Sequence, residues 1–331
     1  IGQLFLLGLA NNQLGPAERS AIVADHLGSV WFVERTTIGV VGIQAVTNAV
    51  QQLAGLATAG VRFFVAANQE GGITQALHGP GFSEIPSALA QGSLPSATLQ
   101  ADAVTWGQQL NAAGVNLVFG PVLDTVPPGT DAQNQPIGAL QREYGHDPAT
   151  VASRGVSVLT GLHQAGAATA IKHFPGLGRV LGNTDFTTAT DTVTTSTDQY
   201  LQPFVLGIHT GAEFVMVALA TYTRIDPGHL AAFSPAVMRD LLRTNLGFSG
   251  VIMSDDLGAT AAVANIPAGT RAVDFLNAGG DLIISKTTPA ALSMVQAIRA
   301  REATDPAFTS RVDDAARRVL RVKESYRLLP C

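Results

Sequence analysis

The sequence predicts an α/β protein: a TIM-like (β/α)8 barrel that forms a single domain over residues 1–331. Eight short apolar runs recur along the chain, and helix-like stretches separate them. Each run is apolar at successive positions, which is typical of strands buried on both faces of a parallel sheet. Strands that alternate with helices form parallel sheets, and eight such strands close a barrel.

The expected elements follow one another at wide, fairly regular intervals. Strands are expected at residues 3–8, 29–33, 61–67, 115–119, 168–173, 214–218, 250–254 and 281–285. Helices are expected at residues 43–59, 97–113, 148–165, 197–210, 235–245, 267–278, 289–301 and 311–327. Several helices begin near Pro or a Ser/Thr cap and end at Gly. An open doubly wound sheet is the alternative, but residues 9–13 lack the Gly-rich phosphate loop that such a sheet normally carries.

Composition excludes several classes of protein. The 331 residues are 46% apolar and 14% charged, which excludes a disordered chain. A net charge of −5, without a clustered basic face, gives no indication of a nucleic-acid partner. No stretch approaches the roughly 18 apolar residues of a membrane span. The single cysteine, Cys331, excludes an internal disulfide framework and a cysteine-based metal site.

Polar residues gather where the expected strands end, which is where barrel enzymes build their active sites. Charged groups at a barrel rim are costly unless they are paired or functional, so their convergence predicts one site. The strand ends in question carry Asn68 to Gly72, Asp124, Lys172-His173, Asp255-Asp256 and Ser285-Lys286.

Asp255 and Asp256 form the most informative pair. We expect Asp255 to face the barrel mouth, where a carboxylate can attack an electrophilic carbon, as in glycosidases. Asp256 is expected to be structural, capping the segment that begins near Leu257. Metal binding by the pair is an alternative, with Asp124 as the obvious further oxygen donor. In a further alternative, Lys172 forms a Schiff base with a carbonyl substrate.

Five ordered segments resemble family 3 glycoside hydrolases, in particular the β-N-acetylhexosaminidase branch. Residues 172–178 read KHFPGLG and resemble the family's KHFPGHG. The segments at 68–72 (NQEGG), 120–124 (GPVLD), 142–148 (REYGHDP) and 248–257 (FSGVIMSDDL) resemble DQEGG, APVLD, RSFGxDP and FxGVIxSDDL. The match covers residues 1 to about 325, so residues 1–331 resemble the family's N-terminal-type barrel domain.

The resemblance implies a retaining exo-β-N-acetylglucosaminidase that releases terminal N-acetylglucosamine from cell-wall-derived glycosides such as muropeptides, as in peptidoglycan recycling. Asp255 falls on the nucleophile, which forms a covalent glycosyl-aspartate intermediate. Charged donors and carboxylates suit sugar hydroxyls. The resemblance implies no metal ion and no organic cofactor. The family's sugar-binding positions fall on Asn68, Asp124, Arg142, Lys172 and His173.

The resemblance fails at the acid/base. The branch carries an Asp-x-His pair on the loop after the fifth strand, and alignment from Lys172 places Asn183 and Asp185 there. We expect Asp185 to act as the acid/base, because a carboxylic acid with a raised pKa can protonate a leaving group. Asn183 is expected to orient it. Asp185 as a turn cap, or Asp191 as the acid, are the alternatives.

Two other functions stay open at this point. Without the usual pair, the chain could be a catalytically impaired amino-sugar-binding protein, or it could have another family 3 activity, such as that of a β-glucosidase or a glycoside phosphorylase. Actinobacterial relatives that lack the pair suggest a cell-envelope or secreted protein, possibly lipid-anchored through a segment outside this chain. A cytoplasmic location is the alternative. We expect a monomer.

Overall fold

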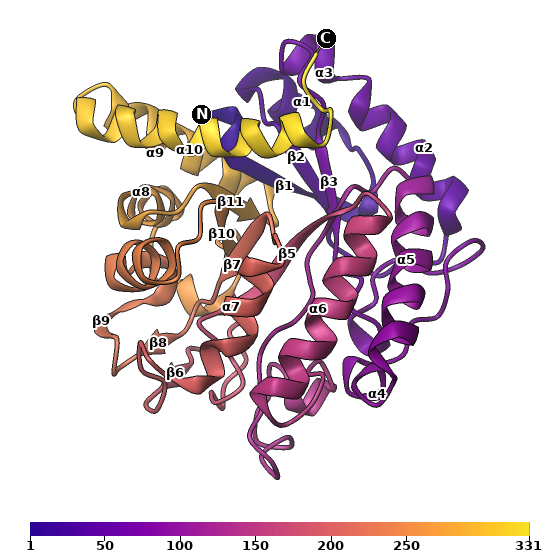
Figure 1. The fold of residues 1–331 in the computed structure, drawn as a ribbon. Helices are drawn as coiled ribbons and strands as arrows, with labels where there is room; N and C mark the ends of the chain where they lie inside the picture. Colours follow the sequence, from indigo (N-terminus) through magenta and orange to yellow (C-terminus); the bar gives the residue numbers. More distant parts are fainter. Residues whose placement is uncertain (331) are drawn as a thin grey trace.

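The structure is a computed structural model that describes residues 1–330 and contains a closed barrel of parallel strands (Figure 1). Cys331 lies outside the described residues. Around the barrel the strand order is β1-β11-β10-β7-β5-β4-β3-β2. The predicted (β/α)8 barrel is therefore confirmed.

The barrel strands coincide with the eight apolar runs. Their bounds are β1 Phe5–Leu9, β2 Ser29–Phe32, β3 Phe64–Ala67, β4 Leu117–Val118, β5 Ala168–Phe174, β7 Phe214–Val217, β10 Val251–Asp256 and β11 Leu282–Ser285. A separate small sheet, which the sequence did not predict, contains β6 Thr190–Asp191, β8 Thr221–Tyr222 and β9 Asp226–Leu230.

Helices surround the barrel. Their bounds are α1 Pro16–Asp25, α2 Gly39–Gln51, α3 Ala54–Ala57, α4 Ala88–Gly92, α5 Ser96–Ala112, α6 Pro148–Gln164, α7 Gln202–His209, the π-helix η7 Ala236–Asn245, α8 Ala268–Ala278, α9 Thr288–Glu302 and α10 Pro306–Ser325. The sequence analysis missed α1 and α4. α4 is only five residues long, and α1 buries few side chains, so neither has a strong apolar stripe.

The strands are continuously apolar because both of their faces are buried. In β1, Leu6 points into the barrel, whereas Phe5 and Leu7 belong to the core between the strands and the helices. β10 repeats this pattern, with Val251 and Met253 inside and Ile252 outside. Successive side chains of a strand point to opposite faces, so a strand buried on both faces needs apolar residues throughout.

Helix α10 lies across the end of the barrel where the strands begin. Its Val319 joins the apolar cluster inside the barrel. The Lys323 amine is fully buried there and donates hydrogen bonds to Gln3 Oε1 (2.8 Å) and to the Gly28 carbonyl (2.7 Å). In Figure 1 α10 and the N-terminus lie toward the top, while β6, β8 and β9 lie at the opposite end. The strands therefore end, and the loops after them gather, away from α10.

Within residues 1–330, no helix combines the length and the apolar character needed to cross a bilayer.

Candidate active site

The carboxyl ends of the barrel strands surround a cavity of about 330 Å³. Its floor is apolar and consists of Trp31, Phe119, Met216 and Ile284, which belong to the packed barrel interior. Its wall is polar and charged. The polar side chains on the wall include Asn68, Arg142, Lys172, His173, Asn183, Asp185, Asp255 and Lys286.

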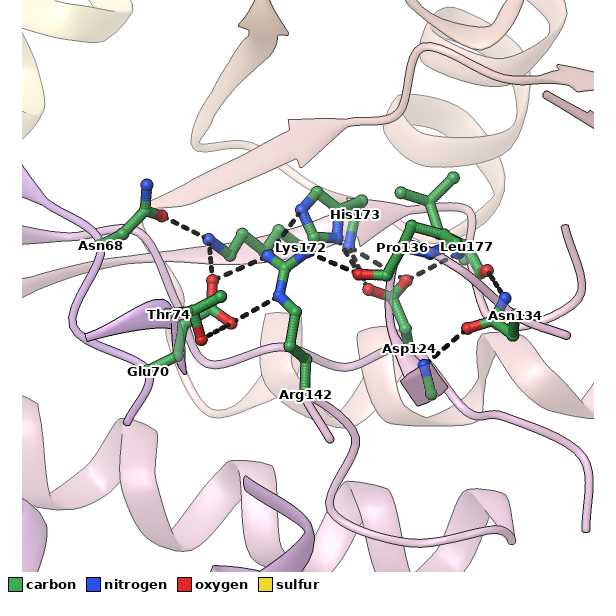
Figure 2. Close-up of polar contacts among 12 residues, drawn as sticks. Asn68, Glu70, Thr74, Asp124, Asn134, Pro136, Arg142, Lys172, His173 and Leu177 are labelled. Carbon is green, nitrogen blue, oxygen red and sulfur yellow. Dashed lines mark hydrogen bonds and ion pairs between the residues drawn. The ribbon is translucent and has the colours of Figure 1, made fainter. Parts of the chain in front are cut away.

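Glu70 is the centre of the charge network at this cavity, as Figure 2 shows. One carboxylate oxygen lies 2.5 Å from Lys172 Nζ, and Arg142 binds both oxygens at 2.8 Å through Nε and Nη2. Lys172 also donates to Asn68 Oδ1 at 2.7 Å. The sequence analysis quoted Glu70 within the NQEGG segment but did not select it as a site residue.

The network consists of charged groups that stabilise one another. Burial alone would raise the pKa of Glu70, but the positive charges of Arg142 and Lys172 outweigh burial and hold that pKa well below its usual range. Burial lowers the pKa of Lys172, and Glu70 opposes that shift. One buried carboxylate thus faces two buried cations, so the group of Glu70, Arg142 and Lys172 has one more positive than negative charge.

Asp124 lies behind the cavity wall, where it holds His173. Its Oδ2 is 2.7 Å from His173 Nδ1, and its Oδ1 accepts the Leu177 N–H at 2.7 Å (Figure 2). Its side chain is fully buried and does not line the cavity. Asp124 was expected among the sugar-binding residues, but its carboxylate oxygens accept hydrogen bonds from His173 and Leu177 instead of facing the cavity. A donor at Nδ1 leaves Nε2 of a neutral ring as an acceptor.

Asp255 and Asp256 end β10 and have different surroundings. The Asp256 carboxylate accepts backbone N–H groups of Gly258 (2.7 Å), Ala259 (3.1 Å) and Lys286 (2.8 Å). Both residues line the cavity, and the Asp255 Oδ1 accepts the Asp256 N–H at 2.8 Å. Asp256 thus fixes the turn after the strand, whereas Asp255 keeps an oxygen available at the cavity.

The loop after β5 brings Asn183 and Asp185 to the same cavity. Asn183 Oδ1 accepts the Asp185 N–H at 3.0 Å. The Asp185 carbonyl accepts the Ala261 N–H at 3.3 Å, so the loop is tied to the segment that follows β10. Asp185 is exposed at the mouth of the cavity. Protein atoms around its carboxyl group displace part of its solvent and raise its pKa, and the negative charge of Asp255 acts in the same direction.

Asp191, the alternative acid, lies elsewhere. Its side chain is 1% exposed and accepts the N–H groups of Val193 and Thr194, both at 2.7 Å, and the Thr194 hydroxyl at 2.6 Å. Asp191 is not part of the cavity wall. These bonds hold the turn after β6.

A barrel whose mouth carries acidic side chains beside a polar, charged wall is typical of glycosidases. Residues 1–322 match the family described as the glycosyl hydrolase family 3 N-terminal domain. The chain therefore belongs to glycoside hydrolase family 3.

Known relatives agree with this family. A β-hexosaminidase of Stenotrophomonas maltophilia is 32% identical over 292 residues, which cover 85% of this chain and 82% of the relative. The crystal structure of a β-N-acetylhexosaminidase from Beutenbergia cavernae is similar with a TM-score of 0.96 and 46% identity, over 98% of this chain and 97% of the other. A family 3 β-N-acetylglucosaminidase from a Paenibacillus species has a TM-score of 0.90 and 26% identity, over 99% of this chain and 62% of the other.

Proposed function

We propose that this enzyme is a retaining exo-β-N-acetylglucosaminidase with Asp255 as its nucleophile. The observation that carries the proposal is the difference in hydrogen bonding between the carboxylates of Asp255 and Asp256 at the end of β10. Both carboxylates line the cavity, but Asp256 accepts three backbone N–H groups, whereas Asp255 accepts one, through Oδ1, among residues 1–330. The names of the relatives, a β-hexosaminidase and a β-N-acetylhexosaminidase among them, support an N-acetylated amino sugar as the substrate.

In the first step, an Asp255 oxygen bonds to the anomeric carbon as the bond from that carbon to the leaving oxygen breaks. Asp185 gives its proton to the leaving oxygen. In the second step, Asp185 takes a proton from water, whose oxygen bonds to the anomeric carbon and releases Asp255. Two inversions at one carbon retain the configuration.

Asp185 supports the role of acid/base by its position and by its charge state. It lines the same cavity as Asp255, and its raised pKa favours the protonated form that the first step needs. Once the Asp255 charge is consumed in the covalent intermediate, one cause of the raised pKa disappears. Asp185 then becomes a better base for the second step. Asn183 positions the backbone of Asp185 through its side-chain oxygen.

The cavity wall supplies the groups that would hold the sugar. Arg142, Lys172 and His173 offer donors or a ring nitrogen at the wall, and Asn68 offers an amide. We propose that these four bind the hydroxyl groups, with Asp124 acting through His173. Because the apolar floor closes the cavity from below, it suits the terminal residue of a glycan rather than an internal one.

We propose cell-wall-derived glycosides, such as muropeptides, as the natural substrates, with the enzyme in the cell envelope or secreted. The support is the resemblance of the sequence motifs, together with room for a large aglycone. A second hollow of about 240 Å³, lined by Glu34, Arg35 and Ile73, adjoins the cavity and shares Arg142 and Asp185 with it.

A mechanism-based fluorinated N-acetylglucosaminide tests the proposal. Brief incubation followed by peptide mapping should place the sugar on Asp255, and Asp256→Asn should still be labelled. Absence of both label and turnover, with N-acetylglucosamine still bound, would indicate an impaired sugar-binding protein. Preference for glucosides, or a sugar phosphate formed only with added phosphate, would indicate another family 3 activity.

A further inference from the structure

Three potential metal ligands lie together outside the cavity, in the segment between β4 and α6. Asp131, Glu143 and His146 each offer one ligand atom, and these atoms lie within 4.8 Å of one another. His146 directly precedes Asp147, the residue that caps α6, so the helix start holds its backbone. The sequence analysis expected no metal; it quoted Glu143 and His146 within the REYGHDP segment but selected none of the three residues as a ligand.

Glu143 is the residue that requires an explanation. Its side chain is fully buried, and within residues 1–330 neither carboxylate oxygen has a hydrogen-bond donor. The buried Oδ1 of Asp131 also lacks a donor there. Arg142, the preceding residue, turns to Glu70 and does not compensate the charge. A buried carboxylate without donor or counter-charge is costly, so a further species is expected to neutralise this one.

We propose that Asp131, Glu143 and His146 bind one divalent transition-metal ion, for which Zn²⁺ and Mn²⁺ are the best matched. Imidazole suits zinc, and carboxylates suit both metals. Asp131 Oδ1 lies 3.4 Å from His146 Nδ1. Two ligands of a tetrahedral zinc ion at about 2.0–2.1 Å are separated by about 3.3–3.4 Å.

The site is open on one side, as an exchangeable ion requires. The side chains of Asp131 and His146 are 37% and 36% exposed, while Glu143 forms the buried wall. An ion can therefore enter from solvent and keep water as its remaining ligands.

The ion would position the catalytic loop without touching the substrate. Arg142, which directly precedes Glu143, donates to the Pro136 carbonyl at 2.8 Å. Arg142 and Pro136 both line the sugar cavity. Asn134 ties the same segment to the loop after β5 through the Leu177 and Val180 carbonyls, both at 2.7 Å. An ion bound between residues 131 and 146 would close this segment at its two ends. Its removal should raise KM more than it lowers kcat.

A proton shared between Asp131 and Glu143 is the competing explanation. Burial raises the pKa of Glu143 to about 8, and the Asp131 carboxylate acts in the same direction. The two explanations differ in what Glu143→Gln does. An amide can donate to Asp131 and so replace a shared proton, but it cannot replace an anionic metal ligand.

The experiment uses the full chain, treated with chelator and then titrated with Zn²⁺ or Mn²⁺ alone. Calorimetry should show one site in the unmodified enzyme, and Glu143→Gln and Asp131→Asn should each weaken it by about 100-fold or more. The metal should raise Tm in the unmodified enzyme but not in these variants. Crystals soaked in the metal should give an anomalous peak among the three side chains.

His229→Asn is the matched control, because His229 is exposed and pairs with Asp226 (3.0 Å) far along the chain from this segment. It should bind the metal as the unmodified enzyme does. Equal affinity in Glu143→Gln would place any bound metal elsewhere and overturn the proposal. A second result would also overturn the proposal: no saturable metal binding to the unmodified enzyme, together with an unchanged or raised Tm in Glu143→Gln. A proton shared between Asp131 and Glu143 predicts this result.

Discussion

Glu70 Oε1 lies 2.5 Å from Lys172 Nζ, and both side chains are at least 97% buried at the edge of the sugar cavity. Arg142 completes the group by donating to both carboxylate oxygens. Because two cations surround one anion, this group of three side chains keeps a positive charge beside the cavity. Glu70 touches no substrate in this scheme, but it determines where Lys172 and Arg142 point.

Glu70→Gln should cost stability and activity together. The substitution leaves two buried cations without their partner, and breaking such a group typically costs about 3–5 kcal/mol. Urea unfolding should show this loss at pH 7, and kcat/KM should fall by about 100-fold or more, as donors move away from the sugar. Since the pKa of Glu70 is lowered in the folded state, the difference between the proteins should shrink as pH falls below about 4.5.

Glu84→Gln is the matched control for that prediction. Glu84 pairs with His78 at 3.0 Å, but its side chain is 75% exposed. Exposed pairs contribute about 0–1 kcal/mol, so this variant should unfold and react nearly as the unmodified enzyme does. A similar loss in both variants would contradict a special role for Glu70.

Asp255→Ala should be inactive and rescued by azide. The small anion can occupy the space of the lost carboxylate and attack the anomeric carbon once, so the product should be the α-glycosyl azide. The anomeric configuration of the product, determined by NMR, checks this outcome. Asp256→Ala should lose stability, because three backbone N–H groups lose the carboxylate that accepts from them, and it should give no α-azide.

Asp185→Asn should slow substrates with poor leaving groups far more than activated aryl glycosides. An acid contributes about 10²–10⁴-fold where the leaving oxygen needs a proton, and little where it does not. Steady-state kinetics over a series of phenols of rising pKa measures the dependence. Asparagine does not titrate, so Asp185→Asn also lacks the carboxyl group whose pKa is raised. The alkaline limb of the pH profile of kcat/KM should therefore change.

Asp191→Asn provides the comparison for Asp185. The buried Asp191 side chain holds the turn at Val193 and Thr194, so its replacement should lower Tm without any leaving-group trend. A trend in Asp191→Asn but not in Asp185→Asn would assign the acid to Asp191 instead.

Lys323 should make stability depend on pH. Burial lowers its pKa from 10.5 to about 7, so between these values the unfolded chain binds more protons than the folded one. The free energy of unfolding should therefore rise with pH across this window, by at most about 1.4 kcal/mol per pH unit. Lys323→Met should lack this rise, as measured by urea unfolding between pH 7 and 9.5. Lys286→Met, which removes an exposed lysine, sets the baseline.

By itself the sequence determined the barrel and the identity of its rim residues. Strands buried on both faces need unbroken apolar runs, so β1 and β10 could be predicted from the sequence alone. The position of Asp255 at the end of a strand could be predicted in the same way. Helix α1 and the small sheet were not visible, because short or weakly amphipathic segments depend on their neighbours for stability.

Only the tertiary structure decided how the rim residues pair. Asp124 and Asn68 both follow strands, yet Asp124 lies behind His173 whereas Asn68 reaches the cavity. Likewise, Glu70 contacts Lys172, which lies 102 positions further along the chain, and Glu143 lies beside Asp131 although neither is at a strand end. A linear pattern specifies which face of its own element a side chain takes. Which partner, proton or ion balances a buried charge depends on other segments, and these come together only when the barrel closes.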